Sequence, residues 1–178
     1  DGFDGVLHMK WNPYFYALSA KENVTLMMYN EINPFTIYKG MARMHDKYLV
    51  VDRQIYMLGG RNTFNYFLGD YSDYKNYDRD VLVWRSEPAA EQEDASVNEL
   101  LAYYETVKNS GECSRYAHGK SLADRYCVKH AAERIAQDYE KYCSEHEELL
   151  ENYSYEDNTF PVESIALLSN PVNAGVKE

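Results

Sequence analysis

Hydrophobic positions in the first half of the chain fall into short runs that are separated by turn residues. Such runs, rich in β-branched residues and tyrosine, are typical of β-strands, and there are four: 23–30, 44–52, 54–58 and 80–84. Only Arg53 separates the second run from the third, which predicts a tight hairpin, although one strand with a bulge would give a similar pattern. We therefore expect these four segments to form one sheet.

After Pro88 the hydrophobic residues recur at helical spacing instead. This pattern predicts one helix over about 97–107 and a second helical stretch over about 121–152, with an apolar stripe on one side and an acidic outer face. From Phe160 the pattern becomes strand-like again, over 164–168. The second half is therefore expected to be mainly helical, with a strand near its end.

Charge separates the two halves of the chain. Residues 1–86 contain ten Lys/Arg and ten Asp/Glu, whereas residues 87–178 contain eight and nineteen, so the whole net charge of −11 lies in the second half. Nucleic-acid binding usually requires a basic surface, so the charge argues against a nucleic-acid partner. The longest charge-free run has 13 residues, fewer than the roughly 20 that a membrane-spanning helix needs. No membrane anchor is expected within this chain.

The thiol and imidazole side chains give little sign of a metal site. The sequence contains three cysteines, Cys113, Cys127 and Cys143. They form no Cys-x-x-Cys pair, and we interpret them as reduced thiols. His130 and Glu133 are one helical turn apart and could bind a metal together with His146, but a polar helix surface explains them more simply.

One segment has a pattern of polar residues that suits phosphate chemistry. It is Met-His-Asp-Lys-Tyr-Leu-Val-Val-Asp over 44–52, followed after six residues by Gly-Gly-Arg-Asn over 59–62. On an extended strand, residues two apart point to the same face, so His45 and Lys47 project together. A neutral imidazole can attack phosphorus, and an ammonium group stabilises negative charge on the phosphoryl oxygens. This pair predicts a phosphoryl-transfer site.

The residues that follow the pair have supporting roles. Gly59 and Gly60 lack a Cβ atom, which allows close approach of another chain segment or a ligand, and Asn62 can place an amide donor there. Asp52 is seven residues from His45, an odd number, so on a regular strand it points away from the site. We therefore expect a structural role for Asp52.

The complete spacing resembles the HKD motif of the phospholipase D superfamily. That motif is His-x-Lys, four residues, Asp, six residues and Gly-Gly-x-Asn, and every signature position and both gaps match. The flanking residues, including Asp-Arg-Asp-Val over 78–81, are similar to the amino-terminal half of bacterial cardiolipin synthases and related proteins. The resemblance covers roughly residues 20–86, and the Leu-Leu-Ser-Asn-Pro over 167–171 resembles a return strand that leads to a second half.

The resemblance implies an α/β fold in which a mixed β-sheet is flanked by helices. It divides the chain into a sheet with the HKD motif over 1–86, an acidic helical insertion over 87–159, and a return strand with a link over 160–178. It also implies a phosphohistidine intermediate formed without a metal or organic cofactor. The catalytic residues would be His45, Lys47, Asn62 and Asp80, the substrate-binding residues His45, Lys47, Gly60 and Asn62, and the structural residues Asp52 and Gly59.

A nucleophilic imidazole needs its second nitrogen to be held by an acceptor. The resemblance assigns this role to Asp80, which would accept a hydrogen bond from His45, and Asp78 has the same parity and is the alternative. In this superfamily two HKD motifs form one active site, and only one is present here. His118-Gly119-Lys120 is no second motif, because Asp124 follows too early and no Gly-Gly-x-Asn comes later. We expect the second motif from chain beyond residue 178, or else from a second copy.

Three functions remain open at this point. The favoured one is a phosphatidyltransferase of the cardiolipin synthase type, acting on a phosphatidylglycerol-like phospholipid at the cytoplasmic face of a bacterial membrane. The alternatives are a nuclease or phosphodiesterase of the same superfamily, and a non-catalytic assembly half. We expect the acidic helices to contribute nothing to the phosphate site, because they would repel an anionic headgroup. We also expect the isolated chain to be inactive, because no second His would protonate the leaving alcohol.

Overall fold

The computed structural model describes residues 5–40, 44–68, 72–116 and 122–169, which belong to two compact units. Unit 1 combines the chain up to Met44 with residues 108–159, and unit 2 combines residues 45–107 with the chain from Phe160 onward. This division differs from the predicted boundary after residue 86. The first helix of the predicted insertion groups with the sheet, and the later helices group with the amino-terminal segment.

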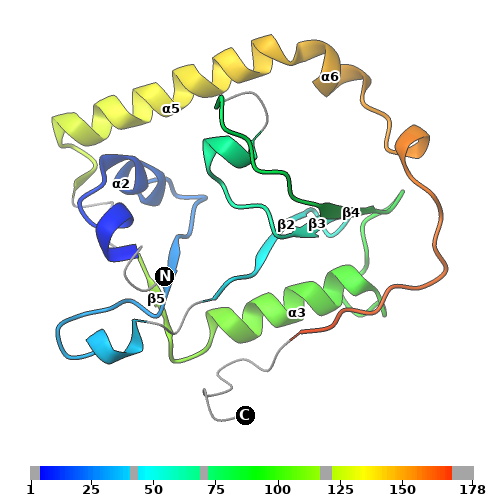
Figure 1. Ribbon diagram of the computed structural model, residues 1–178, viewed down its shortest axis with the longest axis horizontal. Coiled ribbons are helices and arrows are strands. Elements are labelled where there is room, and N and C mark those ends of the chain that lie inside the picture. Colours follow the sequence, from blue (N-terminus) through cyan, green and yellow to red (C-terminus); the bar gives the residue numbers. More distant parts are fainter. Residues whose placement is uncertain (1–4, 41–43, 69–71, 117–121, 170–178) are drawn as a thin grey trace. The chain divides into compact units, whose positions relative to one another are not determined.

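Unit 1 is built on two helices that pack against each other. They are α2 (Pro13–Ser19) and α5 (Tyr126–Glu145), shown in blue and yellow in Figure 1. Pro at the first helical position and Asn12, whose side chain accepts a hydrogen bond from the Tyr14 amide, start α2. The remaining elements of the unit are η1 (Gly5–Met9), β1 (Met27–Tyr29), η2 (Ile37–Lys39), β5 (Cys113–Arg115), α6 (Glu147–Asn152) and η5 (Glu156–Asn158).

The core of unit 1 lies between these helices and the short strands. Its buried residues are Tyr16, Ala17, Met28, Tyr116, Val128 and Ala131. Burial raises the pKa of the Tyr116 hydroxyl, which donates a hydrogen bond to the carbonyl oxygen of Met9 at 3.0 Å. The predicted helical stretch over about 121–152 is present as α5 and α6, and α5 begins at Tyr126. Of its predicted apolar stripe, Ala131 is buried and Leu122 and Ile135 are partly buried against this core. The other stripe residues are exposed: Tyr126, Tyr139, Tyr142 and Leu149.

Unit 2 is a three-stranded antiparallel sheet with one helix against it. The strands are β2 (Lys47–Val51), β3 (Ile55–Gly59) and β4 (Asp80–Trp84) in the order β2-β3-β4, the helix is α3 (Ser96–Lys108), and η3 (Asn65–Phe67) lies in the loop between β3 and β4 (Figure 1). Alternate residues of the strands pack with α3: Tyr48, Val50, Tyr56, Leu58 and Val83 surround Val97 and Leu100. The alternation places the other half of the strand residues on the opposite face.

Two sequence predictions about strands are wrong. The segment over 23–30 does not join the other three strands, because β1 pairs with β5, and backbone bonds from Asn30 to Glu112 (2.7 Å) and from Tyr116 to Leu26 (2.9 Å) extend that pairing. The predicted return strand over 164–168 forms no ladder. Its apolar residue Leu167 packs against the core of unit 2 instead, which satisfies the hydrophobic pattern without a strand.

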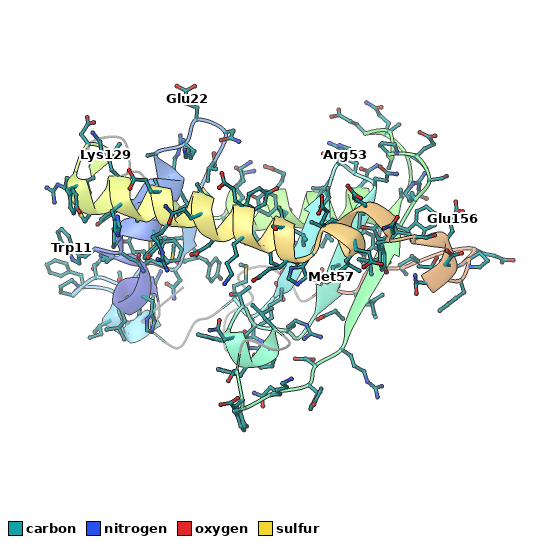
Figure 2. All side chains as sticks on the ribbon, turned by 90° about the horizontal axis from the view of Figure 1, so that it is seen from above. Trp11, Glu22, Arg53, Met57, Lys129 and Glu156 are labelled. Carbon is teal, nitrogen blue, oxygen red and sulfur yellow. The ribbon has the colours of Figure 1, made fainter. Side chains whose placement is uncertain are left out.

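The predicted hairpin between the second and third strands is confirmed. Gln54 donates a backbone hydrogen bond to Val51 at 3.0 Å, and both central residues have positive φ, 50° for Asp52 and 54° for Arg53. This is the type I′ geometry that suits two-residue hairpins. Figure 2 shows Arg53 at this turn, where its guanidinium binds Asn98 at 2.8 Å. Asp52 is thus the first central residue of the turn.

Replacing Asp52 with Val should destabilise unit 2. A β-branched residue at positive φ is strained, and we expect the free energy of unfolding to fall by about 1–2 kcal/mol. Asp52→Asn is the matched control, because Asn tolerates the left-handed region and should leave stability nearly unchanged. Urea denaturation of the variants measures both effects. Equal losses for Val and Asn would show that the carboxylate, not the backbone conformation, is what position 52 requires.

No helix among the described residues combines the length and the apolar composition needed to cross a bilayer.

Candidate active site

The pairing of the strands brings three of the predicted site residues into one row. Lys47 on β2 is opposite Gly59 on β3, and Gly59 is opposite Asp80 on β4. Residues in one row of an antiparallel sheet point to the same face, so the side chains of Lys47 and Asp80 flank a position that has no side chain. The sheet therefore places an ammonium group and a carboxylate on either side of a gap at Gly59.

His45 lies just before this row. The strand begins at Lys47 and not at residue 44 as predicted, so His45 is an exposed residue that leads into β2. The ammonium group of Lys47 turns back and donates a hydrogen bond to the carbonyl oxygen of His45 at 2.6 Å. This bond keeps the charge of Lys47 next to residue 45, as a shared phosphate site would require.

The two glycines leave room for carboxylates. A Cβ atom at Gly59 would lie 1.8 Å from Oδ1 of Asp80, and one at Gly60 would lie 2.7 Å from Oδ2 of Asp78. Both distances are shorter than real Cβ contacts allow, so no other residue fits these positions without movement. The close approach expected at the Gly-Gly pair is therefore made, within the described residues, by the side chains of Asp80, which starts β4, and of Asp78, which precedes the strand.

Arg61 organises this corner, and sequence reasoning assigned it no role. Its Nε donates to Oδ2 of Asp80 at 2.5 Å, and its Nη2 donates to the carbonyl oxygen of Asp78 at 3.1 Å. A third bond goes from Nη1 to the carbonyl oxygen of Phe67. The sequence did contain a signal for this role: an arginine comes directly after Gly-Gly, and two carboxylates lie at or just before the next predicted strand.

The ion pair with Arg61 occupies one oxygen, Oδ2, of the Asp80 carboxylate that the resemblance assigns to His45. Within the described residues, no hydrogen bond joins the His45 ring to Asp80, and Oδ1 of Asp78 accepts from the backbone amide of Arg79 at 2.8 Å. Oδ1 of Asp80 lies over Gly59, on the side of the row that leads to Lys47. An orienting role for Asp80 therefore remains a hypothesis that depends on this second oxygen.

A cavity of about 560 Å³ opens at this end of the sheet. Its lining residues come from the start of β2, the end of β3, α3 and the carboxyl-terminal segment: His45, Asp46, Lys47, Tyr48, Leu58, Gly59, Glu99, Leu100, Tyr103, Leu167, Leu168 and Ser169. The cavity thus collects His45, Lys47 and Gly59. Asn62 and Gly60 lie where the chain leaves β3, outside this lining. His118, Gly119 and Lys120 lie outside the described residues.

The expectation that the helical segment contributes nothing to the site is wrong for α3. Glu99 and Tyr103 line the cavity, and the Tyr103 hydroxyl donates a hydrogen bond to the Asp46 carboxylate at 2.5 Å. The reason is the packing of α3 on the sheet, which brings one edge of the helix to the start of β2. One acidic side chain of α3, that of Glu99, therefore lies at the cavity that His45 and Lys47 line.

The possible metal ligands on the helices do not converge. His130 lies 3.8 Å from Glu133 and stacks on Tyr126, and His146 stacks on Tyr142. In the part of the chain that the structure describes, no group of three or more His, Cys, Asp or Glu side chains could hold a metal ion.

Comparison of the chain with family models, curated proteins and solved structures gave no match. The proposed relation to the phospholipase D superfamily therefore depends on the motif spacing and on the site geometry described above.

Gly59→Ala should destabilise unit 2 by about 1–3 kcal/mol, because the new methyl group displaces the Asp80 carboxylate from Arg61. Gly111→Ala is the matched control, since a Cβ at Gly111 meets no atom within 4 Å. Combining Gly59→Ala with Asp80→Ala should cost less than the sum of the single changes. Urea denaturation of the four variants tests this, and additive losses would contradict the proposed clash.

Proposed function

We propose that this chain supplies one half of the active site of a phospholipase D-superfamily phosphatidyltransferase of the cardiolipin synthase type. The observation that carries the proposal is the row Lys47–Gly59–Asp80, at whose end the ammonium group of Lys47 donates to the backbone carbonyl oxygen of His45. This arrangement offers a nucleophile and a cation to one phosphate group. A second half, in the same polypeptide or in a second copy, supplies the other His.

The proposed reaction has two displacement steps. A ring nitrogen of neutral His45 attacks phosphorus, the bond between phosphorus and the leaving alkoxide breaks, and the second His gives that oxygen a proton. An acceptor alcohol then attacks the phosphohistidine while the second His takes its proton, and the phosphorus–nitrogen bond breaks. Lys47 stabilises the charge on the phosphoryl oxygens in both transition states. Asp80 is proposed to accept a hydrogen bond from the His45 ring at Oδ1 while Oδ2 remains paired with Arg61.

The face of the sheet that bears Lys47 favours a lipid over a nucleic acid. The next row on this face is Leu49, Met57 and Leu82, and the row after it is Val51, Ile55 and Trp84. Leu49, Val51 and Leu82 are exposed. A phosphate site that continues into apolar rows suits an amphiphilic phosphodiester, whereas a nucleic-acid backbone needs a track of basic side chains.

A phosphodiester with p-nitrophenolate as its leaving group tests the nucleophile without a second half. Nitrophenolate departs without a proton at neutral pH, so the missing second His does not block the first step. We expect release of about one equivalent of nitrophenolate per protein and no turnover, because phosphohistidine hydrolysis still needs the second His. Mass spectrometry should find an acid-labile phosphoryl adduct on His45.

The matched variants are His45→Ala, which should release no nitrophenolate, and His130→Ala, which removes an exposed His of α5 and should change nothing. An adduct on another residue would contradict the assignment of the nucleophile. Absence of both adduct and release in the unchanged protein would favour the non-catalytic assembly half. Steady turnover by a monomer would show that one motif suffices.

A further inference from the structure

The loop between β3 and β4 has an unusual density of aromatic side chains. We call residues 60–79 the aromatic loop; it contains Phe64, Tyr66, Phe67, Tyr71, Tyr74 and Tyr77. It also contains three basic residues (Arg61, Lys75 and Arg79) and three acidic ones (Asp70, Asp73 and Asp78), so its net charge is zero in a chain of −11. Apart from the candidate site at its two ends, this loop has no assigned role.

Among the described residues, four aromatic rings of the loop pack on one another. Phe64 stacks on Tyr66 with ring centroids 5.5 Å apart, and Tyr66 also contacts Phe67 and Tyr74, at 5.0 and 6.1 Å. The apolar core of unit 2 is formed by other residues. The rings therefore form a cluster outside the core, and their packing makes it a preformed surface and not a set of separate side chains.

This cluster is open to solvent. Two of its rings are exposed, Phe64 to 57% and Tyr74 to 69%, and elsewhere in the loop Tyr77 and Leu68 are exposed to 92% and 41%. A contiguous patch of exposed apolar side chains on a protein surface is typical of an interaction site. Tyr and Phe together, with little net charge, are the side chains that accumulate at the headgroup level of a bilayer, where one end of a ring is apolar and the other is wet.

The base of the loop is fixed to the candidate active site. Arg61 joins the two ends through Asp80 and the carbonyl oxygen of Asp78, and it also holds the carbonyl of Phe67. The two arms are joined again where the Asn76 amide donates to the carbonyl oxygen of Tyr66 at 2.6 Å. Whatever surface the rings contact is therefore brought next to the row of Lys47, Gly59 and Asp80.

We infer that the aromatic loop is a bilayer-docking element that seats the protein on a phospholipid surface beside His45. The choice of a lipid as occupant rests on the function proposed above and on the match between a neutral aromatic surface and the headgroup region. The loop has no net charge and the rest of the chain is acidic, so attraction to anionic lipid would not hold the protein on a bilayer. The aromatic rings are therefore the groups that anchor it.

The test is co-sedimentation of the purified protein with vesicles of zwitterionic phosphatidylcholine. We expect binding, and we expect it to persist at about 1 M salt, where the Debye length is about 3 Å. Adding anionic lipid should not strengthen it. The loop triple variant, Phe64→Ser with Tyr74→Ser and Tyr77→Ser, should reduce partitioning by about tenfold or more, because three rings no longer enter the interface.

A control triple of the same composition is available elsewhere in the chain. Tyr126, Tyr139 and Phe160 are exposed to 84%, 69% and 81%, and their replacement by Ser should change partitioning by less than about twofold. In addition, the fluorescence of the Trp introduced by Tyr77→Trp should be quenched by brominated acyl chains in the vesicles. His45→Ala should bind vesicles normally, which separates this inference from the proposed chemistry.

Several outcomes would overturn the inference. One is no binding to phosphatidylcholine by the unchanged protein, and another is equal loss in the loop and control triples. Binding that needs anionic lipid and disappears at high salt would assign the contact to charge. If the loop triple instead changed the mass of the protein in solution without altering vesicle binding, the loop would be an interface between copies of the chain.

Discussion

Replacing His45 with Ala should reduce phosphodiester turnover of the complete two-motif enzyme by at least about a thousandfold, or about 4 kcal/mol of transition-state stabilisation. The covalent route needs a nucleophile, and Ala offers none. The structure indicates that the substitution leaves Lys47 in place, because Lys47 is held by the carbonyl oxygen of residue 45 and not by its ring. The variant therefore keeps its cation and loses only the imidazole, so the rate loss reports the nucleophile itself.

The measurement is the initial rate of phosphatidyl transfer by the protein together with its second HKD half. His130→Ala is the control for loss of an imidazole outside the site, and Lys47→Ala should lower the rate by about a hundredfold because the charge on the phosphoryl oxygens loses one partner. Activity of His45→Ala within about tenfold of the parent would refute the assignment of the nucleophile.

The sequence predicted the local geometry of the motif well, because that geometry depends on short-range rules. The hairpin at Asp52 and Arg53 follows from two runs of alternating residues joined by a minimal turn, and the structure has it. The shared face of Lys47 and Asp80 follows once the register is known, since residue parity decides the face. Element type was also predicted correctly for α3 and α5.

Pairing partners and long-range contacts were not predictable in the same way. The strand β5 is Cys-Ser-Arg over 113–115, which has neither alternation nor β-branched residues, so nothing indicated that β1 would pair with it. The contribution of Glu99 and Tyr103 to the cavity depends on how α3 packs on the sheet, a tertiary fact that periodicity along one helix does not contain.

The role of Arg61 shows a different limit. The residue lies at the variable position of Gly-Gly-x-Asn, so the motif itself says nothing about it. Its three hydrogen bonds become visible only when β4 places Asp80 opposite Gly59 and the side chain of Asp78 lies next to Gly60. This ion pair uses Oδ2 of Asp80 and leaves Oδ1, and within the described residues no hydrogen bond joins that carboxylate to the His45 ring.

Tyr56→Ala should be the most destabilising single change in unit 2. Tyr56 is 2% exposed and lies on the central strand β3, where its ring packs with Val97 and Leu100 of α3 and its hydroxyl donates to Ser96 at 2.9 Å. Removing a buried aromatic side chain leaves a cavity, and we expect a loss of about 3–5 kcal/mol, a large fraction of the stability of a small domain.

Tyr56→Phe is the matched control, because it keeps the ring and removes only the hydrogen bond to Ser96, a loss of about 1 kcal/mol. Urea denaturation gives both values, and amide hydrogen exchange in β3 gives the local opening. Since β3 lies between β2 and β4, its opening separates Lys47 from Asp80, so Tyr56→Ala should also expose the amides of both neighbouring strands. Equal losses for the Ala and Phe variants would mean that the hydroxyl, not the packed ring, holds the sheet on α3.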